Sequence, residues 1–325
     1  MTQYVVGIDL GGTNMRAGVA DDTGRVLVKA GEPTRAQTSD GEAILGRLAD
    51  LVARVIGEAD LAPDDILGIG VGVPGPLDPT VGGVKDAPNL GQLDGLPIVG
   101  MLEEKTGLRT LLENDANAAA WGEFWVGAGR GCRSMVMATL GTGIGGGLIF
   151  EGQLLRGIDH TAGELGHVSV VDGGRPCACG SHGCIEAYAS ADSTVRRFRE
   201  ELKRGGGSVL SEVPKKALTC QMIFDAAKEG DLLSLNIAKE TGRLLGLLAA
   251  NVANLLNPER MIFAGGMIGA GDLLFNAIRE ELDRRAFPVP AKRMRILPAE
   301  LGGDAGLIGA AGCALNAFGP DRPDA

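Results

Sequence analysis

No stretch of this 325-residue chain approaches the roughly 18 uninterrupted apolar residues that a membrane-spanning helix needs. The most apolar helix candidate, LLGLLAANVANLL at 244–256, contains two asparagines. The N-terminal MTQYVVGIDL carries no positive charge ahead of its apolar residues, so the pattern of a secretory signal is missing as well. We therefore expect a soluble, cytoplasmic protein with no membrane partner.

The chain also lacks an excess of positive charge, because 31 Lys and Arg against 41 Asp and Glu give a net charge of −10. This sign disfavours nucleic acid as a partner, since a phosphate backbone attracts basic surfaces. The composition is 45% hydrophobic and 22% charged, which is typical of globular proteins and excludes a disordered or fibrous chain. The length allows two domains, each with its own core.

Two familiar nucleotide-binding motifs are missing. The chain contains no G-x-x-x-x-G-K-[ST], so a P-loop is absent. GTGIGG at 141–146 formally satisfies G-x-G-x-x-G, but a dinucleotide fingerprint opens a helix after a strand. Here LIFEGQLL at 148–155 continues as a strand, so the Rossmann interpretation fails on its context.

Two segments instead share a pattern of strand, glycine turn and strand. YVVGIDLGGTNMRAGVAD (4–21) and SMVMATLGTGIGGGLIFEG (134–152) each lead an apolar strand into small residues and a threonine, Thr13 or Thr142. Glycine turns offer backbone N–H groups to a phosphate without an obstructing side chain. The pair predicts an internal duplication whose two turns clasp one polyphosphate, although either turn alone is equally compatible with an ordinary hairpin.

A third glycine cluster, MIFAGGMIGAGDLLFNAIREEL (261–282), combines a strand with helical periodicity. An adenine ring or a ribose can lie close to its glycines, and a plain strand-to-helix turn is the alternative. Further elements alternate along the chain, which predicts α/β layers with mixed sheets. They are helices over 41–57, 95–107 and 231–259, the last capped by Asp231 and ended by Asn257-Pro258, and a buried strand over 66–75.

LLENDANAAAWGEFWVG (111–127) predicts a strand that ends in polar residues and is followed by an alanine-rich helix. Asp115 lies at this junction, where a helix N-terminus stabilises an ionised carboxylate. As a general base it accepts the proton of a hydroxyl that attacks phosphorus. The simpler interpretation is that Asn114 or Asp115 only caps the helix. Asp9, at the end of the first strand, is a candidate for holding Mg²⁺ through water.

Three of the six cysteines, Cys177, Cys179 and Cys184, occupy eight positions, and His167 precedes them. Structural disulfides are rare in a reducing compartment, and neither a C-x-x-C redox pair nor a nearby fourth cysteine for an iron–sulfur cluster is present. Three thiolates and one imidazole form a closed tetrahedral set for a structural Zn²⁺. Spacing alone leaves His182 as an alternative fourth ligand.

Two glutamates flank this cysteine motif. If a metal fixes His167, then Glu164 and Glu186 are drawn into the same small region. Two carboxylates and an imidazole are suitable hydrogen-bond partners for vicinal hydroxyls, although a solvated surface role is the default for either glutamate alone.

Taken in order, these motifs resemble the ROK family of bacterial sugar kinases and repressors, and within it most closely the glucokinases. The resemblance runs from about residue 4 to about residue 315. Its motifs are GIDLGGTN (7–14), GVPGPLD (72–78), PNL (88–90), ENDANAAAWGE (113–123), LGTGIGGG (140–147), GELGH (163–167), CACGSHGCIE (177–186) and AGG (264–266).

The resemblance implies an actin-like ATPase (sugar kinase) fold, α/β, with two lobes around a cleft, and assigns roles to the motif residues. It implies Asp115 as the catalytic base and His167, Cys177, Cys179 and Cys184 as zinc ligands. The implied sugar contacts are Asn114, Glu164, His167, Glu186, Asn89 and Gly75. The implied nucleotide contacts are Asp9, Gly11, Gly12, Thr13, Asn14, Gly141, Thr142, Gly143, Gly145, Gly146, Gly265 and Gly266.

We expect a smaller lobe of residues 1–115 plus about 304–317, a larger lobe of 116–303 with the zinc knuckle at 177–184, a loop at 205–216 and a disordered tail at 318–325. The expected activity is ATP-dependent phosphorylation of a hexose, glucose at its 6-hydroxyl, with Mg²⁺. N-acetylmannosamine, mannose or fructose is the alternative substrate, and polyphosphate the alternative donor.

Two other function classes are less well supported. A sugar-sensing repressor of this family carries a DNA-binding segment before the first strand, and here that strand starts near residue 4. A zinc-dependent oxidoreductase needs an open metal position and a nucleotide fingerprint in context. The family also implies a homodimer or homotetramer.

Overall fold

The computed structural model describes residues 2–87 and 89–319, and their contacts divide the chain into two compact units. The first unit comprises the described residues of Met1–Gly131, Gly147–Gly163 and Glu300–Ala325, and the second comprises Cys132–Gly146 and Glu164–Ala299. The first unit is larger than the expected lobe of 1–115 plus about 304–317. It also takes in 116–131, because helix α3 (Asp115–Val126) packs against helix α10 (Ala305–Phe318).

A five-stranded sheet forms the centre of the first unit. Strands β1, β4 and β7 run parallel, and β2 and β3 add antiparallel neighbours on the other side. The strand order is β3 (Val26–Pro33), β2 (Asn14–Asp21), β1 (Tyr4–Leu10), β4 (Ile66–Val73) and β7 (Thr110–Asn114). A short ribbon of β5 (Leu77–Asp78) and β6 (Gly83–Val84) follows β4. The β1 and β4 strands are buried along nearly all their length, which explains their apolar sequences.

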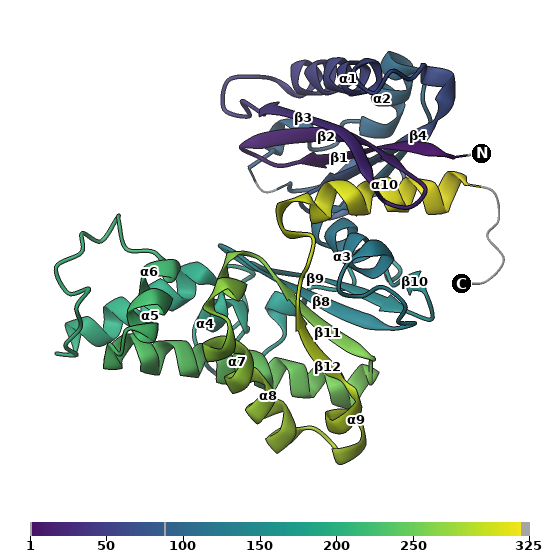
Figure 1. Cartoon of the computed structure of the whole chain (residues 1–325). Helices are drawn as coiled ribbons and strands as arrows, with labels where there is room; N and C mark the ends of the chain where they lie inside the picture. The colour runs from purple at the N-terminus through teal and green to yellow at the C-terminus, as the bar shows by residue number, and fades with distance from the viewer. Residues whose placement is uncertain (1, 88, 320–325) are drawn as a thin grey trace. The chain divides into compact units, whose positions relative to one another are not determined.

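Helices cover both faces of this sheet. Figure 1 shows α1 (Gly41–Glu58) and α2 (Ile98–Thr106) on one face and α10 on the other. Helix α1 begins where the Asp40 carboxylate accepts a hydrogen bond from the Ala43 N–H at 2.8 Å, and α2 follows Pro97 and lies within the expected range 95–107. Apolar side chains repeat on the inner face of α1 and bury it in the core.

Glycines allow α10 to lie between the sheet and α3. A Cβ at Gly70 in β4 would overlap the Ala310 carbonyl oxygen, and a Cβ at Gly309 in α10 would overlap that of Ala118 in α3. These contacts fix the distance between the sheet and α3, the helix that begins with Asp115.

The second five-stranded sheet has the order β10 (Gln153–Leu154), β9 (Ile144–Phe150), β8 (Met135–Leu140), β11 (Arg260–Ala264) and β12 (Arg295–Pro298). Strands β8, β11 and β12 are parallel, β9 and β10 are antiparallel, and β9 carries the chain from one unit into the other after Gly146. The helices of the second unit are α4 (Glu186–Ala189), α5 (Ala191–Lys203), α6 (Cys220–Lys228), α7 (Leu232–Leu256), α8 (Asp272–Arg285) and α9 (Pro288–Arg293).

The two sheets repeat one topology, since β1, β2, β3, β4 and β7 take the same places in their sheet as β8, β9, β10, β11 and β12. The predicted duplication is thereby confirmed at the level of structure. The predicted caps of α7 are also confirmed, because Asp231 accepts from the Ser234 N–H and Asn257 takes a left-handed conformation with φ of 47°.

The predicted C-terminal helix is confirmed as α10, and the predicted loop at 205–216 contains no helix or strand. The predicted tail at 318–325 lies outside the described residues from position 320 on. Phe318 is the last residue of α10, and the Arg109 guanidinium lies 4.2 Å from the centre of its ring.

Candidate functional site

The predicted site residues are divided between the two units. The first unit contains Asp9, Gly11, Gly12, Thr13, Asn14, Gly75, Asn89, Asn114 and Asp115. The second contains Gly141, Thr142, Gly143, Gly145, Gly146, Glu164, His167, Cys177, Cys179, Cys184, Glu186, Gly265 and Gly266.

Asn114 and Asp115 lie where β7 ends and α3 begins. The Asn114 Oδ1 atom accepts hydrogen bonds from the N–H groups of Ala116 and Asn117 at 3.0 and 3.1 Å, so Asn114 is the N-cap. Its Nδ2 atom donates to the Gly75 carbonyl oxygen at 3.3 Å. Asn114 provides the cap, and the Asp115 carboxylate accepts a hydrogen bond from the Ala116 backbone N–H at 2.8 Å.

The Asp115 carboxyl group lies in an environment that favours its protonated form. Burial raises its pKa above the ordinary value of 3.8, and the hydrogen bond from the Ala116 backbone offsets part of that effect. The pKa of Asp9 is raised as well, first by burial and then by the charge of Asp115, while Arg16 lowers it. Two interacting carboxyl groups with raised pKa values are a feature of proton-transfer sites.

The turn between β1 and β2 is built as a tight glycine loop. The Gly11 N–H donates to the Asn14 carbonyl oxygen at 3.0 Å, and the Thr34 hydroxyl donates to the Gly11 carbonyl oxygen at 2.6 Å. A Cβ at Gly12 would lie 2.6 Å from that of Asn89, so these two predicted residues are neighbours. The turn can present backbone N–H groups to a phosphate.

The equivalent turn between β8 and β9 is tied to Glu186. The Gly141 N–H donates to the Gly143 carbonyl oxygen at 3.0 Å, and the Gly145 N–H donates to the Thr139 hydroxyl at 3.2 Å. The Glu186 Oε2 atom accepts from the Ile144 N–H at 2.8 Å. A glutamate predicted to bind sugar and a turn predicted to bind phosphate therefore form one cluster.

His167, Cys177, Cys179 and Cys184 come together as a group whose ligand atoms all lie within 4.8 Å of one another. The Cys177 Sγ atom is 3.6 Å from the His167 Nδ1 atom, and the Cys179 and Cys184 sulfurs are 3.7 Å apart. Sulfurs about 2.3 Å from a tetrahedral ion are separated by about 3.8 Å, so the donor set fits such an ion. His182 is exposed and is not part of this group.

The two nitrogens of His167 face different groups. Its Nδ1 atom faces the cysteines, whereas its Nε2 atom lies 3.8 Å from the Glu164 Oε2 atom. The Glu164 side chain is 58% exposed and can therefore reach a ligand from solvent. A metal ion on Nδ1 would fix the ring and leave Nε2–H as a donor beside this carboxylate.

The third glycine cluster forms a short 3₁₀ turn, Gly266–Ala270, between β11 and α8. Gly265 has φ of 91°, and a Cβ there would overlap the Leu140 carbonyl oxygen. Only glycine fits this approach between neighbouring strands, whereas Gly266 has open space around it. The predicted strand and helix are confirmed, with the 3₁₀ turn inserted between them.

Two residues next to the predicted site, Glu113 and Arg156, were missed from the sequence. Glu113, one residue before Asn114, is 1% exposed, and its Oε2 atom accepts from the Arg156 Nε atom at 2.7 Å. The available signal was a carboxylate inside the apolar strand LLEN.

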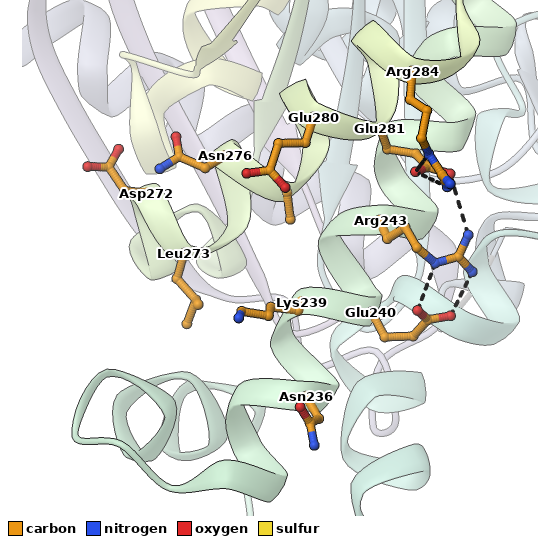
Figure 2. Close-up of a pocket in the computed structure, with 11 residues that line it drawn as sticks. Asn236, Lys239, Glu240, Arg243, Asp272, Leu273, Asn276, Glu280, Glu281 and Arg284 are labelled. Carbon is orange, nitrogen blue, oxygen red and sulfur yellow. Dashed lines mark hydrogen bonds and ion pairs between the residues drawn. The ribbon is translucent and has the colours of Figure 1, made fainter.

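A separate groove of about 720 Å³ lies on α7 and α8 of the second unit, and Figure 2 shows its lining side chains. Within it, Arg243 pairs with Glu240 at 2.8 Å and approaches Glu281 at 3.5 Å. None of the predicted site residues lines this groove, and its two arginines, Arg243 and Arg284, are paired with its glutamates Glu240 and Glu281.

Among the described residues, no helix is long and apolar enough to span a membrane.

Comparison with known proteins gives consistent relatives. The model of the ROK family matches residues 5–317. A glucokinase from Halalkalibacterium halodurans is 37% identical over 310 residues, which cover 94% of this chain and 93% of that protein. The structure of a ROK family glucokinase from Streptomyces griseus in complex with glucose and AMPPNP has a TM-score of 0.77 and 34% identity, and the match covers 95% of this chain and 98% of that one.

A ROK hexokinase from Thermus thermophilus gives a TM-score of 0.81 at 34% identity and covers 95% of this chain and 97% of that one. These relatives have the actin-like ATPase fold of sugar kinases, so the predicted fold class is confirmed.

Proposed function

The chain belongs to the ROK family, and on that premise we propose that it is a sugar kinase that transfers a phosphoryl group from ATP to the 6-hydroxyl of glucose. The observation that carries the proposal is the partly desolvated Asp115 carboxylate at the start of α3. Support comes from the glucokinase of H. halodurans and from the S. griseus glucokinase, whose structure contains glucose and AMPPNP.

In this proposal, Asp115 accepts the proton of the sugar 6-hydroxyl while the hydroxyl oxygen attacks the γ-phosphorus of ATP and ADP leaves. Burial makes the carboxylate a stronger base than a solvated one, because the protonated form is favoured. Asn114, whose amide is held by Gly75, is proposed to bind a neighbouring sugar hydroxyl. Glu164, His167 and Glu186 are proposed to bind the remaining hydroxyls, and Asn89 to line the same pocket.

The glycine turns at 11–14 and 141–146, together with Gly265 and Gly266, are proposed to bind the nucleotide through backbone N–H groups. Mg²⁺ neutralises phosphate charge when it is bound with ATP. Asp9 is the residue proposed to hold the ion, since it lies near the end of β1, beside the first turn.

The metal at His167, Cys177, Cys179 and Cys184 is proposed to be zinc. The sulfur-rich donor set and its tetrahedral spacing support zinc, and four protein ligands leave no position open for a reacting water. The proposed role is therefore structural, because the ion holds the His167 ring that faces Glu164.

A coupled assay of ADP release over a panel of hexoses tests the kinase proposal. We expect turnover with glucose above that with mannose, fructose or N-acetylmannosamine, and ATP above polyphosphate as donor. The isosteric Asp115→Asn variant, with Asp115→Ala beside it, should lose turnover by roughly a hundred- to ten-thousand-fold. If no sugar gives turnover above these variants, the proposal is wrong.

The zinc proposal is tested separately by elemental analysis, which should find close to one zinc per chain after gentle purification. The Cys179→Ser variant should lose affinity for glucose more than for ATP, because the ion orients His167 and not the nucleotide turns. Equal loss of both affinities would indicate general unfolding. The homodimeric or homotetrameric state and the cytoplasmic location stay predictions.

A further inference from the structure

Glu113 is a buried carboxylate that holds the start of α3. Its Oε1 atom accepts hydrogen bonds from the Asn114 backbone N–H and from the Asn117 Nδ2 atom, both at 3.1 Å. Among the described residues, the Asn117 Oδ1 atom has no hydrogen-bond partner. Asn117 lies two residues beyond Asp115, and its side-chain amide is therefore anchored by Glu113.

The other oxygen of the same carboxylate holds a different segment of the first unit. The Glu113 Oε2 atom accepts from the Arg156 Nε atom at 2.7 Å. The Arg156 carbonyl oxygen accepts from the Ala162 N–H at 3.0 Å, which closes the loop 156–162. This loop has little packing of its own, since Ile158 is 96% exposed, and the chain continues from it directly to Glu164.

The energetics of this pair favour a role in geometry over one in stability. The Glu113 side chain is 2% exposed and that of Arg156 is 35% exposed. Removing a carboxylate from water costs about as much free energy as pairing it returns, so an apolar pair would serve stability equally well. A fixed hydrogen-bonded ion pair, in contrast, sets the direction of both segments.

We propose that Glu113 and Arg156 form a positioning pair, which couples the start of α3 to the loop 156–162 and thereby sets Asp115 against the sugar hydroxyl. The proposal rests on the proposed sugar kinase function. Neither residue touches substrate in it, since both act through Asn114, Asn117 and the loop. A general base must lie within hydrogen-bond reach of its proton, and a displacement of about 1 Å can cost roughly a hundred-fold in rate.

Three substitutions test the pair. Glu113→Gln keeps an acceptor for Asn114 and Asn117 but directs an amide NH₂ at Arg156. Arg156→Met removes the donor, and Arg156→Lys keeps the charge without the Nε geometry. We expect kcat with glucose to fall at least about 10-fold in Glu113→Gln and Arg156→Met, with KM for ATP within about twofold of wild type. Arg156→Lys should recover part of the lost kcat.

The double variant, Glu113→Gln with Arg156→Met, should be no slower than the slower single variant, because both changes break one interaction. Glu281→Gln is the matched control. Glu281 is 4% exposed and paired with arginines in the second unit, away from the predicted site residues. It should lower the melting temperature and leave kcat unchanged.

The pair is purely structural if Glu113→Gln and Arg156→Met lower the melting temperature as Glu281→Gln does but keep kcat within twofold. The coupling would also be overturned if the fold-losses of kcat in the two single variants multiplied in the double variant. If Glu113→Gln does not fold, the kcat values of Arg156→Met and Arg156→Lys decide, because the Arg156 side chain is partly exposed and its replacement is better tolerated.

Wild-type protein without turnover on any sugar would contradict the proposed function instead. Hydrogen exchange then tests the pair itself. Arg156→Met should speed exchange of the amides of 157–162, and unchanged exchange there would overturn the pair.

Discussion

The carboxyl group of Asp115 links the stability of the protein to pH. Burial raises its pKa in the folded state above the ordinary 3.8. Folding therefore favours the protonated form, and the stabilisation is full below about pH 3.8 and is lost as the pH rises through the raised pKa. At pH 7 the ionised group lowers the free energy of unfolding, so Asp115→Asn should raise the melting temperature by a few degrees.

Thermal unfolding of wild type and Asp115→Asn between pH 4 and pH 8 checks this expectation. The difference between their melting temperatures should shrink toward acid, where both side chains are neutral. Asp283→Asn is the control, because Asp283 is exposed and its replacement should leave the melting temperature unchanged at every pH. A variant less stable than wild type at pH 7 would show that the weakened hydrogen bond from Ala116 outweighs the cost of burying the charge.

Glu123 is a second buried carboxylate, and only backbone groups bind it in the described structure. It is 0% exposed and accepts hydrogen bonds from the N–H groups of Ala128, Glu300 and Leu301 at 2.8 to 3.1 Å. The chain first leaves the first unit after Gly131 and last returns to it at Glu300, so this carboxylate ties the first and the last of the connections to α3.

Glu123→Gln should cost about 2–3 kcal/mol of unfolding free energy, because a neutral amide has one acceptor oxygen and its NH₂ group faces backbone donors. Urea unfolding measures the cost. Glu58→Gln, which breaks only the exposed pair with Arg54, should leave the urea midpoint close to that of wild type. Equal midpoints for the two variants would refute the anchoring role.

Some of these individual residues could be identified from the sequence, and others could not. The cysteines, His167 and Asp115 belong to short local motifs whose chemistry limits their use. Glu113, Arg156 and Glu123 were missed, because their roles depend on partners far along the chain: residues 43 apart for Glu113 with Arg156 and 177 apart for Glu123 with Glu300. A buried glutamate in an apolar strand or helix marks such a residue without naming its partner.

Among the elements, α10 depends most on glycine, because it lies between a sheet and a helix. A methyl group at Gly309 would overlap the Ala118 carbonyl oxygen, and no flexible side chain can yield there. Gly309→Ala should therefore destabilise the protein by about 3 kcal/mol, although alanine is the better helix former by about 1 kcal/mol. Gly46→Ala in α1 is the matched control, since nothing lies within 4 Å of its Cβ position.

Urea unfolding of the two glycine variants separates packing from propensity. Gly46→Ala should stabilise the protein by about 0.5–1 kcal/mol, which is the opposite sign to Gly309→Ala. If both substitutions stabilised the protein, the structure around Gly309 would be able to relax.

Helices and strands with a strong apolar periodicity were predicted well from the sequence. The division of these elements between the two units was not. Helix α7 follows from its apolar period and from Asp231 and Asn257 at its ends. The grouping of α3 with the first unit could not be predicted, because it depends on packing against α10, which lies about 180 residues further along the chain.

At the scale of the whole molecule, two sheets with one topology carry different additions. The second copy contains the donor set of His167, Cys177, Cys179 and Cys184, whereas the described residues of the first unit contain no comparable group. The segment around it has little regular structure, since only the 3₁₀ turn Leu165–His167 and isolated bridges occur between Glu164 and Ile185. A bound ion would therefore supply much of the order of this segment.

Metal removal should consequently act on one part of the molecule. After treatment with a chelator, we expect faster hydrogen exchange in 165–185 and unchanged exchange in β1 and β4, whose side chains form a separate core. Glucose affinity should fall at least about 10-fold, as is typical when a group that orients a ligand-binding residue is lost, while ATP affinity changes by less than about twofold. Re-addition of Zn²⁺ should restore both exchange and affinity, and Mg²⁺ should not, because thiolates favour the softer ion. Uniformly faster exchange in both sheets would show instead that the ion stabilises the whole protein, and His167 would then have no separate role in sugar binding.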